Sequence, residues 1–376
     1  MPQLDWRIMD RISFDRKEID NATIVPAAWP GMPDTKIFDT PVSPKENYRM
    51  LYEHKIPYWL PTWGDSQFFA PRIDPDNIAR VQIFEANPLA PEERTGCADK
   101  FGIPWVFVEQ VGGSMVEPGN PAMLDANDWP DVIKFPDVAN WDWAGSAAAN
   151  KDFVNTNKFL SFTFVTGFFE RLISFMDFEN AAVALIDDDQ KDAVHSLFNA
   201  LVDCYCDIIG RAYNAYGGFD GIWFHDDWGA QRAPFFSLDV VMEMVVPYIK
   251  RVREFCHSLG IFFDMHSCGK NEILVPAYIE IGADSWSGQP MNDKQMIYDK
   301  YGDKIILGME MDVSWSFGDP PLELDVATAA AQRFIDKFVP NFKQKPVLMG
   351  SLFGPEGYSE YVYEAGRKAL DAIASS

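Results

Sequence analysis

The sequence lacks the marks of secreted and membrane proteins. Its five cysteines, at positions 97, 204, 206, 256 and 268, are odd in number and show no disulfide spacing, which is typical of the reducing cytoplasm. The N-terminal segment carries charges throughout and has no apolar core of a signal peptide. No apolar run reaches the roughly 18 residues of a membrane-spanning helix. We therefore expect a cytoplasmic protein with no membrane contact.

Basic residues are scarce beside acidic ones. Lys and Arg number 32 against 56 Asp and Glu, so the formal net charge is -24 at pH 7. A field of this sign repels nucleic acid and disfavours a substrate that carries many negative charges. No GxSxG elbow, P-loop or GxGxxG motif follows an apolar run. Hydrolase, nucleotide-transfer and Rossmann functions therefore have no support.

What the chain does contain is an alternation of short apolar runs with longer segments of helical spacing. This alternation predicts βα units and a parallel sheet. The expected helices cover 190–214, 237–258 and 325–338. The expected strands are 57–61, 104–109, 160–165, 220–225, 261–266, 282–286, 304–309 and 345–350. Eight strands with intervening helices predict a closed (β/α)8 TIM barrel.

The domain organisation follows from this count. We expect one barrel domain over residues 1–376, with residues 1–55 as an N-terminal extension. Residues 110–150 are rich in Gly, Pro, Trp and Asp, and they predict a long ordered loop. Long ordered loops at the strand ends of a barrel are usually functional.

Catalytic groups of such barrels lie just past the carboxyl ends of strands. His225, Asp226 and Asp227 directly follow the fourth expected strand. Two adjacent carboxylates raise the pKa of one of them, as a general acid or base requires, so all three residues are catalytic candidates. The alternative is that Asp227 caps the following turn while Asp226 holds a cation such as Arg232.

The fifth expected strand ends in a candidate metal site. His266 and Cys268 are two residues apart on a strand, so their side chains point to the same face, and both are good zinc ligands. A buried histidine beside an inert cysteine is the alternative. Further ligands would come from other strand ends, and the candidates are Asp227, Asp284, Glu310, Asp312 and Glu356.

The remaining strand ends supply candidates for substrate contacts. Glu170 follows the third expected strand and is a further catalytic candidate. Aromatic rings near strand ends predict an apolar pocket with few polar groups, although core packing explains each ring equally well. The substrate-binding candidates are Trp63, Phe69, Trp228, Gln231 and Trp286.

These motifs also occur together in a known order. DDWGAQ at 226–231, HSCG at 266–269 and IGAD at 281–284 follow one another at successive strand ends. In this order the chain resembles the uroporphyrinogen decarboxylase superfamily, and within it the corrinoid-linked methyltransferase-like branch. The similarity covers roughly residues 40–372 and is most specific between 220 and 290. The resemblance implies a (β/α)8 barrel with the active site at its mouth.

The resemblance also implies a zinc site and a partner. Zinc enzymes of the family use a His-x-Cys pair, matched by His266 and Cys268, and a later cysteine. No cysteine occurs at 351–357, where it would fall, so a carboxylate such as Glu310 or Glu356 would replace it. The chain has no DxHxxG cobalamin motif, so the corrinoid would be carried by a separate protein. Barrels of this family often form homodimers.

The expected reaction is methyl transfer from a small donor, such as a methoxyaromatic compound, to that corrinoid protein. Zinc would activate the leaving oxygen, or Asp226 or Asp227 would protonate it. Alkyl transfer to a thiol such as coenzyme M is one alternative. A decarboxylase is another, which the acidity disfavours and for which the Arg-rich element of the family is missing around residues 27–36. The third is a non-catalytic ligand-binding barrel.

Overall fold

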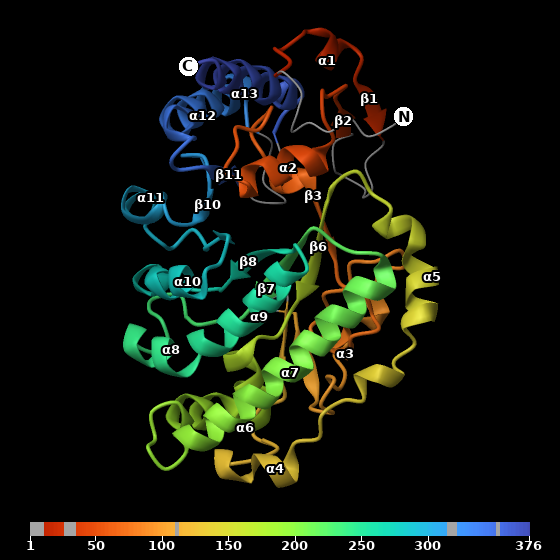
Figure 1. Cartoon of the computed structure of the whole chain (residues 1–376), viewed down its shortest axis with the longest axis vertical. Helices are drawn as coiled ribbons and strands as arrows, with labels where there is room; N and C mark the ends of the chain where they lie inside the picture. Colours follow the sequence, from red (N-terminus) through yellow and green to blue (C-terminus); the bar gives the residue numbers. More distant parts are fainter. Residues whose placement is uncertain (1–10, 26–34, 110–112, 314–321, 351–353) are drawn as a thin grey trace. The chain divides into compact units, whose positions relative to one another are not determined.

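The computed structural model describes residues 11–25, 35–109, 113–313, 322–350 and 354–376 (Figure 1). The chain divides into two compact units, each taken by itself below. Unit 1 is drawn from Met1–Gln67, Asn157–Phe159 and Gly302–Ser376, and unit 2 from Phe68–Thr156 and Leu160–Tyr301. The prediction of a single domain over 1–376 stays a prediction.

Unit 2 is built on parallel strands. The strands β6 (Phe159–Phe164), β7 (Gly221–His225), β8 (Phe262–His266) and β9 (Ser285–Trp286) pair in sequence order, each parallel to the next. All residues of β6 are buried because the run is apolar and covered on both faces. These strands coincide with the third to sixth strands predicted from the sequence.

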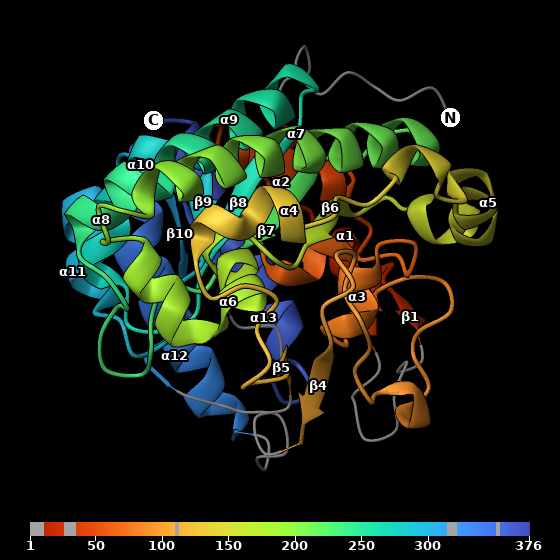
Figure 2. The same ribbon diagram turned by 90° about the horizontal axis from the view of Figure 1, so that it is seen from below.

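Long helices connect these strands. The helices are α6 (Phe168–Ala184), α7 (Lys191–Tyr216), α8 (Leu238–Met244), α9 (Val246–Ser258), α10 (Val275–Ile281) and α11 (Lys294–Tyr301), with the 3-10 helix η6 (Glu272–Leu274). Figure 2 shows α7 and α9 side by side along β7 and β8. The helix α7 ends at Gly217, whose φ of 76° suits glycine.

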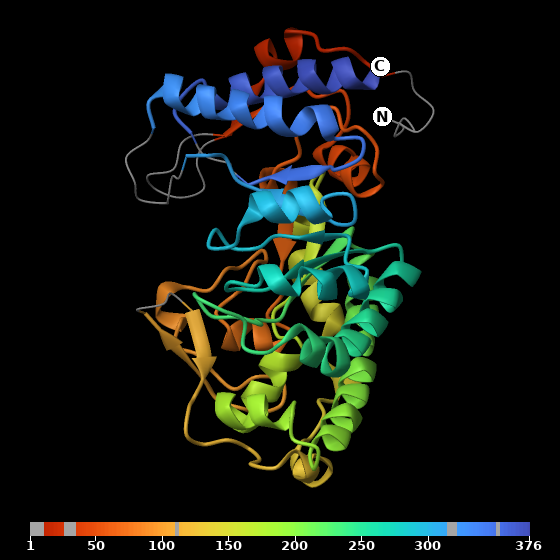
Figure 3. The same cartoon turned by 90° about the vertical axis from the view of Figure 1, so that its left-hand side faces the viewer.

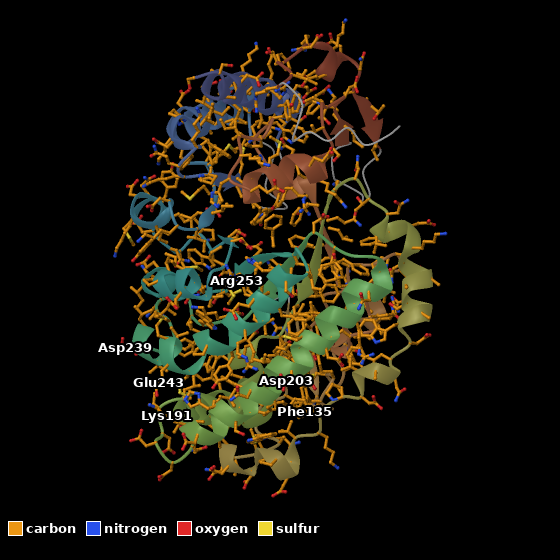
Figure 4. All side chains as sticks on the ribbon, in the orientation of Figure 1. Phe135, Lys191, Asp203, Asp239, Glu243 and Arg253 are labelled. Atoms are coloured by element: carbon orange, nitrogen blue, oxygen red, sulfur yellow. The ribbon has the colours of Figure 1, made fainter. Side chains whose placement is uncertain are left out.

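Polar side chains fix the outer ends of these helices. Lys191, at the start of α7, pairs with Glu243 of α8 at 3.1 Å, and Arg251 of α9 lies 3.8 Å from Asp203 of α7. Lys191, Glu243 and Asp203 lie on the outer side of the unit (Figure 4). The apolar faces of α7 and α9 are turned inward, as their spacing predicts.

The second predicted strand has a different role. Residues Trp105–Val108 form β4, which pairs antiparallel with β5 (Gly113–Val116) in a separate two-stranded ribbon (Figure 3). The run forms a strand because it is apolar and aromatic. Its hydrogen-bonding partner, however, is the neighbouring strand β5 and not a strand of the parallel sheet. The parallel sheet therefore does not contain it.

The rest of unit 2 consists of short elements. They are α3 (Pro75–Ala79), η3 (Pro91–Glu93), η4 (Ala126–Asp128), α4 (Trp129–Val132), η5 (Val138–Asn140) and α5 (Trp143–Val154). The predicted loop 110–150 thus contains a strand and three short helical segments, as well as the first part of α5. Residues 110–112 lie outside the described residues.

Unit 1 contains both ends of the chain. Its strands β10 (Ile306–Met309) and β11 (Val347–Met349) pair in parallel, and α12 (Leu324–Phe338) packs against α13 (Tyr358–Ala374). Its other elements are α1 (Lys17–Asp20), β1 (Thr23–Val25), β2 (Thr35–Ile37), α2 (Pro44–Tyr52), η2 (Trp63–Asp65) and η7 (Val339–Asn341), and β3 (Ser66–Phe69) begins there. The predicted extension 1–55 is part of this packed unit where it is described.

The first predicted strand, 57–61, does not form a strand, because Tyr58 and Trp59 lie in a bend. The side chain of Asn47 takes the place of a neighbouring strand. Its amide nitrogen donates to the carbonyl of Trp59 at 3.1 Å, and its oxygen accepts the N–H of Tyr58 at 2.6 Å. The strand that follows in this part of the chain is β3, which the sequence analysis did not predict.

The fold is therefore α/β, with a TIM-barrel-like succession of parallel strands and helices. Among the described residues the parallel strands number seven, namely β3 and β6 to β11, whereas a closed barrel needs eight. The prediction of a closed (β/α)8 barrel is wrong in this respect, because the run at 104–109 is used in the β4–β5 ribbon. No described helix is long and apolar enough to cross a membrane.

Candidate metal centre

The carboxyl ends of β7 and β8 lie side by side in unit 2. His225 and His266 are direct partners in the parallel ladder. Asp227 and Cys268 each follow two residues later, so strand alternation returns them to the same side. Ligand atoms of all four side chains lie within 4.8 Å of one another. We call these four residues the metal cluster.

The contacts within the metal cluster bring nitrogen, oxygen and sulfur donors together. His225 Nε2 lies 3.3 Å from Asp227 Oδ1, and His266 Nε2 lies 3.4 Å from Cys268 Sγ. The backbone N–H of Cys268 donates to Asp227 Oδ1 at 2.7 Å. Two imidazoles, a thiol and a carboxylate are the ligand types that zinc takes. The residues present therefore fit a zinc ion.

Each histidine is held through a hydrogen bond outside the cluster. His225 Nδ1 lies 2.7 Å from Glu170 Oε2, and Glu170 Oε1 accepts from Arg80 at 2.5 Å. His266 hydrogen-bonds the backbone of Ser287. Metal-binding histidines commonly have a carboxylate or carbonyl partner of this kind, which fixes the ring and its tautomer. Because Glu170 contacts Nδ1 of His225, the other ring nitrogen, Nε2, is available to the metal cluster.

The charges of the cluster follow from its geometry. Burial lowers the pKa of His225, but the carboxylates of Asp227 and Glu170 outweigh it and raise this pKa well above its ordinary value. Burial and the neighbouring His225 lower the pKa of His266 to about 3. Burial raises the pKa of the Cys268 thiol. Without a metal, the cluster at neutral pH thus contains an imidazolium, a neutral imidazole and a thiol.

Asp226 faces away from the cluster. It is fully buried and accepts the backbone N–H groups of Phe168, Phe169 and Glu170 at 2.9–3.2 Å, and the indole N–H of Trp228 at 3.0 Å. Burial, followed by the Glu170 charge, raises the pKa of Asp226 to about 7. Its partners are backbone amides rather than Arg232. The structure thus places Asp226 as the cap of α6.

The turn before α6 leaves room for this cap. A Cβ on Gly167 would lie 2.4 Å from Cβ of Asp226, which is closer than real contacts allow. Glycine is therefore required there if Asp226 is to reach the first N–H groups of α6. The cap fastens the first turn of α6, and with it Glu170, to the end of β7.

The loop after β8 is held by side-chain amides. Gln289 accepts the N–H of Gly269 at 2.7 Å, and Asn292 donates to the Gly269 carbonyl at 2.9 Å. Asn271 donates to Ser267 Oγ at 2.9 Å, and Ser267 Oγ accepts the N–H of Trp228 at the same distance. The position of Cys268 is therefore fixed by its own loop together with Gln289 and Asn292, which follow β9.

The predicted aromatic contacts are mostly in the core. Phe69, Trp228 and Trp286 are fully buried, and Tyr278 stacks between the two tryptophans at 5.0 and 5.1 Å. Gln231 is exposed. The predicted contact of Phe69, Trp228, Gln231 and Trp286 with a substrate stays a prediction.

Other candidates have partners or lie outside unit 2. Asp284 pairs with His257 at 2.8 Å, and Asp312 pairs with Arg333. Trp63, Glu310 and Glu356 belong to unit 1, whereas the four residues of the metal cluster belong to unit 2. The predicted roles of these three residues at the site stay predictions. Residues 351–353, part of the segment where the family has its later cysteine, lie outside the described residues.

Two neighbours of the site were missed from the sequence. Arg80 lies at the end of α3, away from any strand end, and no pattern pointed to it. Trp223 lies two residues before His225, on the same face of β7, and its ring stacks on His266 at 4.7 Å. Strand alternation could have identified it.

Comparisons with known proteins do not assign the chain to a family. No family model matches the chain, and no curated protein sequence matches it. Similar solved structures include the C-terminal domain of a chitinase-like protein from Desulfitobacterium hafniense, with 8% identity over 83% of this chain and 99% of that one and a TM-score of 0.37. Xylanase B from Clostridium stercorarium has 13% identity over 57% and 73%, with a TM-score of 0.31.

A third structure, described as IolI protein with a bound zinc atom, has 11% identity over 63% of this chain and 82% of that one, with a TM-score of 0.27. All three TM-scores are low, so none of these likenesses carries a conclusion about the present site.

Proposed function

We propose that the metal cluster binds zinc and that the protein is a zinc-dependent methyltransferase acting on a small methyl donor. The observation that supports this most directly is the convergence of His225, Asp227, His266 and Cys268 from two adjacent strand ends. When bound, a zinc ion would act as a Lewis acid on the heteroatom of the methyl donor, which makes that atom a better leaving group.

The surroundings favour a catalytic site over a structural one. Structural zinc sites are closed by four protein ligands, whereas catalytic sites keep a position open. The Asp227 side chain is 28% exposed, while that of His225 is 5% exposed. Solvent therefore reaches the Asp227 side of the cluster. His225, His266 and Cys268 would hold the ion, and Asp227 lies where a substrate can approach.

The chain's own residues set up this reaction. Glu170 orients His225, and the loop after β8 orients Cys268. Asp227, whose pKa His225 and Arg80 lower although burial opposes them, stays ionised beside the incoming donor. The methyl acceptor would be a corrinoid on a separate protein, which is proposed from the sequence resemblance alone.

The experiment begins with metal content. We expect about one zinc ion per chain in the wild type and loss of it in Cys268→Ala, with no loss in the matched control Cys97→Ala. Methyl transfer from 2-methoxyphenol to cob(I)alamin is then followed by absorbance, with coenzyme M as the competing acceptor.

The outcomes separate the parts of the proposal. A folded wild-type protein without zinc would contradict the metal site. Transfer to coenzyme M in place of cobalamin would retain the zinc and replace the acceptor. Full transfer by Cys268→Ala would remove the cluster from the reaction.

A further inference from the structure

A row of aromatic rings lies directly beside the metal cluster. Trp223 stacks on His266 with ring centroids 4.7 Å apart and lies 5.2 Å from the ring of His225. Phe68 meets Trp223 edge-on at 5.8 Å, and Phe84 lies 6.2 Å from Phe68. All of these residues belong to unit 2.

These rings reach the surface of the unit, whereas three of the rings predicted from the sequence to contact a substrate do not. Trp223 and Phe68 are partly exposed, and Phe84 is 46% exposed. Phe69, Trp228 and Trp286 are fully buried. An exposed aromatic surface next to polar groups that converge on one point is typical of a ligand site.

Buried hydroxyls lie on the same face of the sheet. Thr163 is the ladder partner of Trp223, and Ser287 follows Ser285, the ladder partner of Asp264, by two residues. Thr163 Oγ1 and Ser287 Oγ are both buried and have no hydrogen-bond partner within the described part of the chain. A buried hydroxyl without a partner is costly, and a polar group on a ligand would satisfy it.

We infer that Trp223 and Phe68 form the wall of a subsite for a neutral, planar aromatic ring whose oxygen reaches the metal cluster. This inference rests on the proposed function, because the cluster supplies the metal to which that oxygen binds. A flat ring matches the offset and edge-on contacts that aromatic side chains offer. A cationic ligand is disfavoured because the zinc ion of the proposed site would repel it.

The test compares two alcohols that differ in their rings. Phenol is planar and aromatic, whereas cyclohexanol has the same hydroxyl on a saturated ring. Binding of each to the zinc-loaded full chain is measured by titration calorimetry, and zinc content is measured in the same samples. We expect phenol to bind about tenfold more tightly than cyclohexanol, the ratio that an aromatic contact supplies.

Substitutions assign the preference to one ring. Trp223→Leu removes the preference for phenol, and Trp223→Phe retains most of it. The matched control is Trp141→Leu, which changes another partly exposed tryptophan of unit 2, one that stacks on Trp143. It leaves the preference unchanged.

The outcomes distinguish this inference from the proposed function. Zinc-loaded wild type that does not bind phenol more tightly than cyclohexanol, including one that binds neither, overturns the subsite and leaves the metal site standing. Retention of the preference in Trp223→Leu also overturns it. A chain that takes up no zinc overturns the proposed function itself. If Trp223→Leu does not fold, the wild-type comparison and Trp223→Phe still decide.

Discussion

Two clusters of charged side chains meet at the first turn of α6, and they differ in how their charges are satisfied. Glu170 belongs to the metal cluster's surroundings, whereas its neighbour Arg171 belongs to the other, which we call the aspartate cluster. In the aspartate cluster Arg171 contacts Asp76 and Asp99, and Lys100 lies 2.7 Å from Asp74.

The aspartate cluster is closed. Its members are buried, and their charged groups bind one another, neighbouring backbone N–H groups and the hydroxyl of Ser174. Asp99 also accepts the indole N–H of Trp105 at 3.0 Å. The aspartate cluster contains no histidine or cysteine. The metal cluster instead combines partly exposed donors that point at one another. Burial of charge therefore does not distinguish the two clusters. The proposed metal site differs in that its nitrogen, oxygen and sulfur donors converge on one point.

The largest effect is expected from breaking the aspartate cluster. Arg171→Met leaves Asp99 buried without its cation and leaves Asp76 with Lys100 alone, at 3.2 Å, which costs about 3–5 kcal/mol of the free energy of unfolding. Urea denaturation measures this loss. Zinc bound per folded chain stays unchanged in the variant, and its loss would show that the two clusters are not separate.

The second largest effect is expected on the pH dependence of zinc affinity at the metal cluster. The raised pKa values of His225 and Cys268 mean that both carry a proton at pH 7, and zinc must displace both. Affinity therefore rises with pH, by about a hundredfold per pH unit below both pKa values. Calorimetry in buffers of different ionisation enthalpy counts the protons. Release of no proton at pH 7 would rule out ligation by these two side chains.

A smaller effect is expected from the partner of His225. Glu170→Gln keeps the size of the side chain and the backbone N–H that Asp226 accepts, but it removes the charge beside His225. Zinc affinity should fall about 10–100-fold, as for other partners of metal-bound histidines. Competition with a chromogenic chelator measures it. Unchanged zinc affinity would show that the Arg80–Glu170 pair stabilises the fold but does not support the metal cluster.

The smallest effect is expected at the exposed pair on the outside of the unit. Lys191→Ala removes the contact with Glu243, and such pairs contribute less than about 1 kcal/mol. Thermal unfolding should therefore match the wild type within a few degrees. A loss of stability as large as that of Arg171→Met would contradict the expectation that exposed ion pairs contribute less to stability than buried ones.

Strand alternation accounts for what could be predicted of the site. His266 and Cys268, two residues apart, were expected on one face, and the structure places their donor atoms 3.4 Å apart. The same rule applied to His225 and Asp227 would have separated Asp226 from them and brought in Trp223. Arg80 could not be found in this way, because it reaches Glu170 across the fold from α3.

The fold was predictable to a similar extent. Apolar runs located β6, β7 and β8, since most residues of these strands are apolar and at least one face of each strand is buried. The sequence of a single strand does not determine which other strand pairs with it. Residues 104–109 therefore read like a barrel strand, although Val106 pairs with Met115 in an antiparallel ribbon.

The hydrogen bonds around Gly269 have a practical consequence. Gln289, Asn292 and Asn271 hold the loop after β8 through bonds that involve no metal ligand side chain. The chain thus need not refold around an incoming ion, so uptake should be limited by diffusion and proton release rather than by rearrangement. If the cluster binds zinc as proposed, the metal-free protein should stay folded, and spectroscopically visible ions such as cobalt should exchange into it reversibly.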